Sequence, residues 1–280
     1  MPNWVYHRMR LTGSAQALER FIAQLKPKDP EAEDSSEYVL DFNVWDPMPA
    51  ELASEVGSRS HLGDELLSNM DAPWETFLSR HPWCMRLCQA LDTTAFLVVG
   101  DVVRWVEAQP LDDTGQPLTP SQTTVQELQR SIALGRTRLQ CVERHGHADW
   151  YSWSIAHWGT KWNGGPCEGY RPSETALELR FDTAWASPEP VLRRIAQTHP
   201  GLSGSVDYLD EGFGFAGTYR FGAEVPDGFE DESAPDVAAF AREVFEFDVD
   251  EEDTDPEDEP GEPAAAARVA GTNQETAFLN

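Results

Sequence analysis

The stretch LELRFDTAWASPEPVLRRIAQTHP, from Leu177 to Pro200, predicts a strand followed by a helix. Apolar and polar side chains alternate from Leu177 to Thr183, which is typical of a half-buried strand. Ser187 is the expected N-cap, and Pro188 suits the first helical position. The helix then carries one apolar stripe, formed by Val191, Leu192, Ile195 and His199. Pro200-Gly201 ends it.

A hairpin is predicted directly after this helix. Ser205–Leu209 and Phe213–Phe221 flank the turn residues Asp210-Glu211-Gly212. We expect one face of the second strand to be aromatic, with Phe213, Phe215, Tyr219 and Phe221 on it. The unit therefore reads strand, helix, strand, strand.

A second unit, strand–helix–strand, is predicted in residues 1–46. From Trp4 to Leu11 the side chains alternate, with Val5, His7, Met9 and Leu11 on one face and Trp4, Tyr6, Arg8 and Arg10 on the other. Ser14 is a suitable N-cap for a helix whose apolar stripe is Leu18, Phe21, Ile22 and Leu25. We expect Tyr38–Trp45 to form the next strand.

Residues 47–148 are predicted to be a mostly helical insertion. Trp74, Phe77 and Leu78, and later Trp83, Leu87 and Leu91, have helical spacing. Phe96–Val106 fits a helix or a strand equally. Residues 111–124 read as a loop, and Val125–Leu139 as a helix.

Four of the ten tryptophans lie in DWYSWSIAHWGTKWN, residues 149–163. Asp149 is the expected N-cap of a helix that runs to about His157, apolar on two faces and therefore buried between layers. One stripe is Trp150, Trp153 and His157, and the other is Tyr151, Ile155 and Trp158. Gly159 fits the left-handed position that ends helices, and Thr160–Asn163 is expected to be extended.

These aromatic residues have two interpretations. As core, each buries a large area. As a site, the turn places His157, Trp158, Thr160, Lys161, Trp162 and Asn163 around a pocket for an anion or a planar ligand. Lys161 could also lie over an indole face, a contact worth roughly 0.5–2 kcal/mol.

WSIAHWGTKWN resembles the signature of the YubB-like family of plasmid and phage proteins, which carry ferredoxin-like domains. Further segments match in order: NWVYHRMRLTG, FNVWDPMP, LRFDTAWASPEPVLRRIAQTHP and FGFAGTYRFG. Trp150, Trp153, Gly159, Trp185 and Tyr219 are then expected to be structural signature residues. The resemblance implies a split βαβ/βαββ fold and a mobile-element origin, but no activity.

Acidity dominates the composition, because 49 acidic and 21 basic side chains give a net charge of -28. Such a field repels nucleic-acid phosphate and anionic lipid and attracts basic partners, although solubility alone also explains it. The acidic segment 224–247 has a possible short helix around Asp236–Phe247, and residues 248–280 are expected to be a disordered acidic tail. No apolar run is long enough to span a membrane, and no signal peptide is evident, which indicates the cytoplasm.

Catalytic and metal-binding patterns are weak. Cys141, His145, His147, His157 and Cys167 lack paired zinc-ligand spacing, and Cys84 and Cys88 read as core thiols. No iron–sulfur run, nucleophile elbow or phosphate loop occurs. We therefore expect no metal, cofactor or catalytic residue.

The sequence thus predicts an α+β protein: a ferredoxin-like, mainly antiparallel sheet in residues 1–46 and 149–223, with a helical insertion between them. We expect a non-enzymatic interaction protein from a mobile element that engages a basic protein, with DNA mimicry as one form. The alternative is a small-molecule- or anion-binding domain or enzyme that uses the Trp158–Asn163 corner. Direct nucleic-acid binding is disfavoured by the charge.

Overall fold

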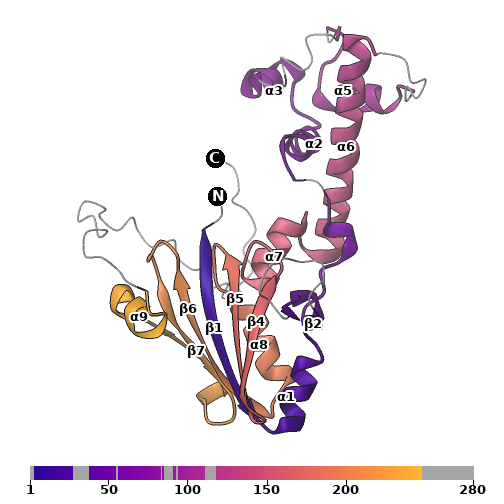
Figure 1. The fold of residues 1–280 in the computed structure, drawn as a ribbon. Coiled ribbons are helices and arrows are strands. Elements are labelled where there is room, and N and C mark those ends of the chain that lie inside the picture. Colours follow the sequence, from indigo (N-terminus) through magenta and orange to yellow (C-terminus); the bar gives the residue numbers. More distant parts are fainter. Residues whose placement is uncertain are drawn as a thin grey trace.

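The computed structural model describes residues 3–27, 38–54, 56–82, 84, 91–92, 94–110 and 118–247. Figure 1 shows a twisted sheet with helices packed against it and a helical unit that projects from one end. Within the described ranges, no helix combines the length and apolar character needed to cross a membrane.

Among the described residues, the sheet has eight strands in the order β2-β3-β4-β5-β1-β6-β7-β8. Their bounds are β1 Trp4–Gly13, β2 Lys26–Pro27, β3 Tyr38–Val39, β4 Pro166–Ser173, β5 Ala176–Ala184, β6 Leu202–Asp210, β7 Ala216–Phe221 and β8 Phe229–Ser233. Neighbouring strands are antiparallel throughout, so β1 runs parallel to β4 across β5, and β5 runs parallel to β6 across β1. Two split βαβ units therefore interleave, which is the ferredoxin-like fold and confirms the predicted class.

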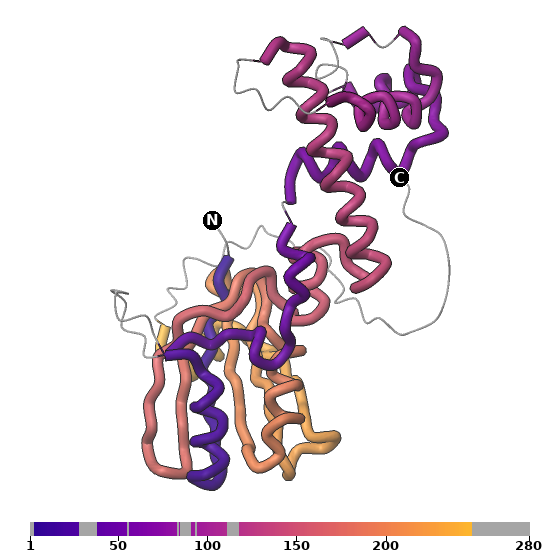
Figure 2. Tube along the Cα trace, turned by 90° about the vertical axis from the view of Figure 1, so that its right-hand side faces the viewer, coloured from indigo at the N-terminus to yellow at the C-terminus, as the bar shows by residue number. Residues whose placement is uncertain are grey.

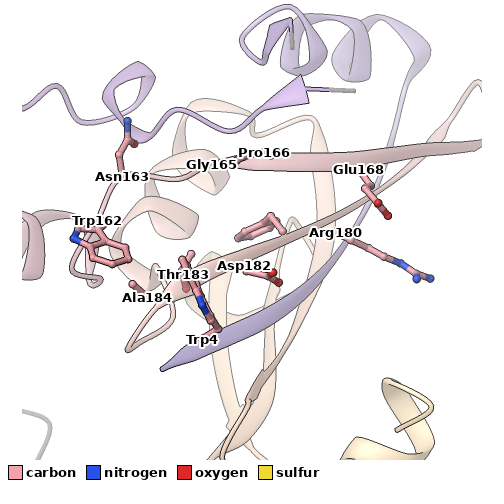
Figure 3. Close-up of a pocket in the computed structure, with 11 residues that line it drawn as sticks. Trp4, Trp162, Asn163, Gly165, Pro166, Glu168, Arg180, Asp182, Thr183 and Ala184 are labelled. Carbon is pink, nitrogen blue, oxygen red and sulfur yellow. The ribbon is translucent and has the colours of Figure 1, made fainter. Parts of the chain in front are cut away.

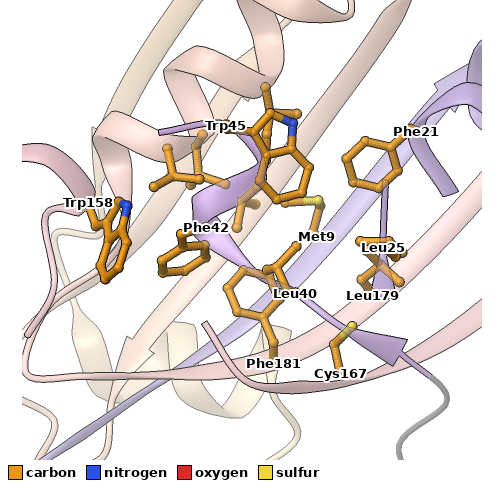
Figure 4. Close-up of a cluster of buried hydrophobic side chains, with 14 of the residues drawn as sticks. Met9, Phe21, Leu25, Leu40, Phe42, Trp45, Trp158, Cys167, Leu179 and Phe181 are labelled. Atoms are coloured by element: carbon orange, nitrogen blue, oxygen red, sulfur yellow. The ribbon is translucent and has the colours of Figure 1, made fainter. Parts of the chain in front are cut away.

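The alternation predicted for β1 and β5 is confirmed, and it builds the main core. Met9 lies opposite Leu179 of β5 and Val206 of β6, and all three side chains are fully buried. Figure 4 shows how Phe21, Phe42 and Trp45 cover this face of the sheet. The main core therefore lies on the side of the sheet that these residues cover.

Helices α1 (Ala15–Ile22) and α8 (Glu189–Thr198) pack over that core, and Figure 2 shows them side by side on the same face. Ser14 caps α1 as predicted, since its side chain accepts from the amide of Ala17. The N-cap prediction for Ser187 is wrong: Pro188 occupies the cap position, and the Ser187 hydroxyl lies 2.8 Å from Nε2 of His7.

The described part of the insertion is helical: α2 (Ser58–Ser68), α3 (Trp74–Arg80), α5 (Val99–Glu107) and α6 (Pro120–His145). They share a second core that includes Leu66, Trp74 and Leu128. The loop predicted for 111–124 is wrong from Pro120 onward, where Thr119 caps α6; residues 111–117 lie outside the described ranges, as do Trp83, Leu87 and Cys88.

The strand predicted for Tyr38–Trp45 is largely wrong. Only Tyr38–Val39 pairs, and the carboxylate of Asp41 then accepts from the amide of Asn43, which starts a 3-10 turn η1 at Phe42–Val44. A second turn, η2, spans Ala50–Leu52. The aromatic row predicted for β7 is also shortened, because Phe213 and Phe215 lie in the exposed turn before the strand.

The acidic segment forms part of the sheet. After the turn η3 (Pro226–Gly228), β8 pairs with β7, and helix α9 (Val237–Val244) then packs on the face opposite α1 and α8. Ala241 of α9 is buried against Leu209 and Ala216. The short helix predicted around Asp236–Phe247 is therefore confirmed; the tail predicted for 248–280 lies outside the described ranges.

Candidate functional site

Helix α7 (Trp150–Trp158) and the turn after it hold the residues predicted as a site. Asp149 caps the helix through a 2.8 Å bond from the amide of Ser152. Gly159 follows with φ 81, and a Cβ there would lie 2.6 Å from Pro190 Cδ. Glycine is thus required both by the left-handed backbone and by the close approach of α8.

His157 and Trp158 are structural parts of this turn. Trp158 is 3% exposed, and its indole Nε1 donates to the backbone oxygen of Asp46 at 3.0 Å. The His157 ring stacks on Trp153 at 4.2 Å, and its Nδ1 lies 3.0 Å from the carboxylate of Asp46. Arg194 also reaches that carboxylate, at 2.9 Å.

Thr160 and Asn163 also make structural contacts. The buried Thr160 hydroxyl donates to the backbone oxygen of Ala184 at 2.6 Å. The Asn163 amide accepts from the amide of Phe42 and donates to Asp41, both at 2.7 Å. Burial acts to raise the pKa of Asp41, but hydrogen bonds from Lys26, Asn163 and Asn43 outweigh it and hold that pKa at about 2. Four of the six predicted binding residues thus fasten α7 to η1 and β5.

Lys161 and Trp162 remain accessible. The Lys161 ammonium lies 5.8, 5.4 and 6.0 Å from the ring centres of Tyr151, Trp162 and Trp185, within reach of cation–π attraction. Trp185, expected to be scaffold, is 50% exposed and has φ 73, an unusual conformation for a bulky residue.

The other predicted signature residues lie deeper. Trp153 and Tyr219 are buried and Trp150 is half-buried. The second buried stripe predicted for α7 is wrong, since Tyr151 and Ile155 are 42% and 46% exposed in the described structure. Thr160–Trp162 forms bends, where an extended segment was expected through Asn163.

A cavity of about 540 Å³ opens on the face of the sheet that α1 and α8 leave free. Figure 3 shows the indoles of Trp4 and Trp162 at one end and the side chains of Glu168, Arg180 and Asp182 along the strands beside them. The two indoles are 5.9 Å apart and inclined at 58°. We call this cavity the sheet groove.

The charge of the sheet groove is uneven. Arg180 pairs with Glu178 at 3.2 Å, and Arg8 holds the same carboxylate at 3.0 Å. No lysine or arginine of the described ranges lies within ion-pair distance of Asp182. Burial raises the pKa of Asp182, and the charges of Glu168 and Glu211 raise it further. Asp182 is nevertheless solvent-accessible. Its carboxylate can therefore bind a cationic group that enters the sheet groove.

A second cavity of about 210 Å³ continues the groove and shares Arg180 and Asp182 with it. Tyr6 on β1 and Phe245 and Phe247 after α9 line it. The Phe247 ring meets Tyr6 edge-on at 5.5 Å. The accessible surface thus runs from two indoles, past carboxylates, to a second aromatic pocket.

Catalytic and metal chemistry find little support in the described ranges. No group of three or more histidine, cysteine or acidic side chains is placed to hold a metal ion there. Ser187 and His7 are in contact, but burial lowers the pKa of His7 to about 3, so this imidazole is a poor general base near neutral pH. The pair therefore reads as structural.

The sequence reasoning did not predict the sheet groove as a whole, although two of its predicted binding residues, Trp162 and Asn163, line it. The available signal was the second face of the strand Trp4–Leu11, which carries Trp4 and Tyr6 away from the core. Its partners Trp162, Glu168 and Asp182 come from segments more than 150 residues away, and nothing local indicates that they meet.

A family model that matches part of this chain describes the same kind of fold. No curated protein matches the chain. The crystal structure of a protein api92 from Yersinia pseudotuberculosis aligns with 84% of this chain and 99% of its own, at 11% identity and a TM-score of 0.37. Residues 157–248, which include β4 to α9, match the family model described as the ferredoxin-like domain in Api92-like protein.

Proposed function

We propose that this protein is a non-enzymatic binding protein that engages a basic protein partner through the sheet groove. The observation that carries the proposal is the accessible carboxylate of Asp182, which faces Glu168 and Glu211 and lacks a cationic partner in the described ranges. A cationic group that enters would relieve the repulsion among these carboxylates. Recognition would then come from local geometry as well as from bulk charge.

The net charge of -28 supports the same partner class. A strongly acidic surface accelerates encounter with a basic protein and disfavours acidic competitors. The arginines on the sheet face are held in ion pairs, Arg8 and Arg180 with Glu178 and Arg10 with Asp207. This pairing is a further argument against direct nucleic-acid binding, which needs free cations for phosphate.

The finer prediction of a DNA mimic from a plasmid or phage depends on the net charge and on the resemblance to YubB-like proteins. Acidic and basic side chains alternate on the sheet face, which favours a discrete groove over a phosphate-like stripe. We therefore place the basic partner in the groove.

The test is a titration of the full chain with a blocked, unstructured peptide that carries lysines and arginines in equal number. We expect the double variant Asp182→Asn, Glu168→Gln to bind at least tenfold more weakly than the unmodified protein, because it removes the carboxylates that attract the cation. Isothermal titration calorimetry at low and near-physiological ionic strength measures this directly.

A matched control comes from the helical unit. Glu75→Gln with Glu143→Gln changes the net charge equally at exposed positions on α3 and α6, which do not line the groove. This control should bind the peptide about as well as the unmodified protein. Equal weakening in both double variants would show that only bulk charge matters and would reject the groove.

A second candidate, an anion or planar ligand at Lys161, is favoured by one observation: its ammonium is surrounded by three accessible aromatic rings. The Lys161 backbone makes the structural contacts here, accepting from Ser154 and donating to Ala184, so Lys161→Ala should fold normally. If this candidate holds, binding of a nucleoside monophosphate, followed by tryptophan fluorescence, should be lost in Lys161→Ala and kept in Arg130→Ala, at an exposed cation on α6. A folded Lys161→Ala variant that binds unchanged would exclude it.

A further inference from the structure

We infer that the sheet groove recognises an arginine side chain within an extended segment of the partner protein. The inference rests on the proposed function and names the group that the groove selects. It depends on three features of the groove: its indole end, its carboxylates and its continuation into the second cavity.

The indole end suits a planar cation. Trp4 and Trp162 are inclined at 58° with their centres 5.9 Å apart, so the rings meet at an angle and are not stacked face to face. Trp162 is 39% exposed although it is one of the largest apolar side chains. A guanidinium plane stacks on an indole face, and Trp is the strongest of the cation–π partners.

The carboxylate of Asp182 is placed to receive the same group, with Glu168 beside it. Asp182 of β5 and Glu168 of β4 lie on the open face of adjacent strands, and Glu168 is in register with Arg180, two residues from Asp182. A guanidinium presents several N–H donors in one plane and pairs with carboxylates in a bidentate manner. The lysine ammonium is compact and strongly hydrated, so it gains less binding free energy from an indole face and from a carboxylate that accepts two hydrogen bonds.

The continuation of the groove indicates a chain and not a free amino acid. The second cavity shares Arg180 and Asp182 with the first and is walled by Tyr6, Phe245 and Phe247. An extended segment places alternate side chains on the same side. An arginine in the first cavity would therefore bring an apolar side chain two residues away over the second.

The experiment compares three blocked peptides that differ only at one position, which is arginine, lysine or citrulline, with leucine two residues further on. We expect the arginine peptide to bind the full chain at least tenfold more tightly than the lysine peptide. Citrulline, which has nearly the same shape without the charge, should bind more weakly than either. Isothermal titration calorimetry at near-physiological ionic strength measures the affinity of all three peptides.

Two tryptophan variants test whether the indole end of the sheet groove causes the preference for arginine. Trp162→Leu should reduce the preference for arginine over lysine to less than threefold, whereas Trp105→Leu, at a similarly exposed tryptophan on α5, should leave it unchanged. Equal binding of the arginine and lysine peptides, or equal effects of the two tryptophan variants, would overturn the inference. The proposed function would still stand if the mixed basic peptide bound the protein and the double variant at Asp182 and Glu168 weakened that binding. If the mixed basic peptide did not bind at all, the proposed function itself would be rejected, and the arginine preference with it.

Discussion

Replacing Trp158 with alanine should lower the free energy of unfolding by about 3–5 kcal/mol, whereas the same change at Trp162 should cost about 1 kcal/mol or less. The two residues are four apart in one motif, but Trp158 is 3% exposed and Trp162 is 39% exposed. Trp158 also packs edge-on against Phe42 at 6.0 Å, so its loss leaves a cavity between α7 and η1. Urea denaturation followed by circular dichroism measures both variants.

Trp158→Phe serves as the control for the indole N–H. This variant keeps most of the buried area but removes the donor to the Asp46 backbone oxygen, so it should cost about 1–3 kcal/mol. The expected order of stability is therefore Trp162→Ala, then Trp158→Phe, then Trp158→Ala. Comparable losses at Trp158 and Trp162 would mean that the division of the motif into a buried and an accessible half is wrong.

The elements that sequence reasoning identified are those whose signal is local. The alternation of β1 and β5, the Ser14 cap of α1 and the Asp149 cap and Gly159 terminus of α7 are each encoded within about ten residues. The ferredoxin-like class was implied by the resemblance to YubB-like proteins, and it fits two such units that bury one shared face once paired. These predictions needed no knowledge of distant partners.

The strands that sequence reasoning missed, β4 and β8, are stabilised by the strands beside them. β4 reads PCEGYRPS and β8 reads FEDES, with two prolines in the first and one apolar residue in the second. Neither has the alternation of a half-buried strand, because most of their side chains are exposed. Their extended form is favoured by hydrogen bonds to β5 and β7, which are already held by the core.

The predicted corner was misjudged for a related reason. Its polar residues looked available because their partners are far away in sequence: Asn163 bonds to Asp41 and Phe42, and Trp158 to Asp46. The turn itself was placed correctly; Trp162 and Asn163 are its exposed members, and Lys161 is half-buried. A local pattern can locate a turn, but only the tertiary structure shows which polar groups remain unpaired.

Lowering the pH should destabilise the protein through His7, by roughly 4 kcal/mol between pH 6.5 and pH 3. His7 is 2% exposed on the core face of β1, stacked on Phe181 at 4.7 Å. Burial lowers its pKa from 6.5 to about 3, and its buried Nδ1 has no hydrogen-bond partner among the described residues. Between these two pKa values the unfolded chain binds a proton at His7 and the folded chain does not. The contribution of His7 to the free energy of unfolding is therefore fully present above about pH 6.5 and is lost as the pH falls toward 3.

His7→Gln isolates this contribution, because both proteins share the same carboxylates and the same relief of acidic self-repulsion at low pH. Near neutral pH the variant should be less stable by about 1–3 kcal/mol, since the stacked ring is lost and the bond to Ser187 is perturbed. Below about pH 6 the difference in unfolding free energy should shrink by about 1.4 kcal/mol per pH unit and then change sign. A difference independent of pH would show that His7 titrates alike in the folded and unfolded chains, and NMR titration of its ring protons would then give an ordinary pKa.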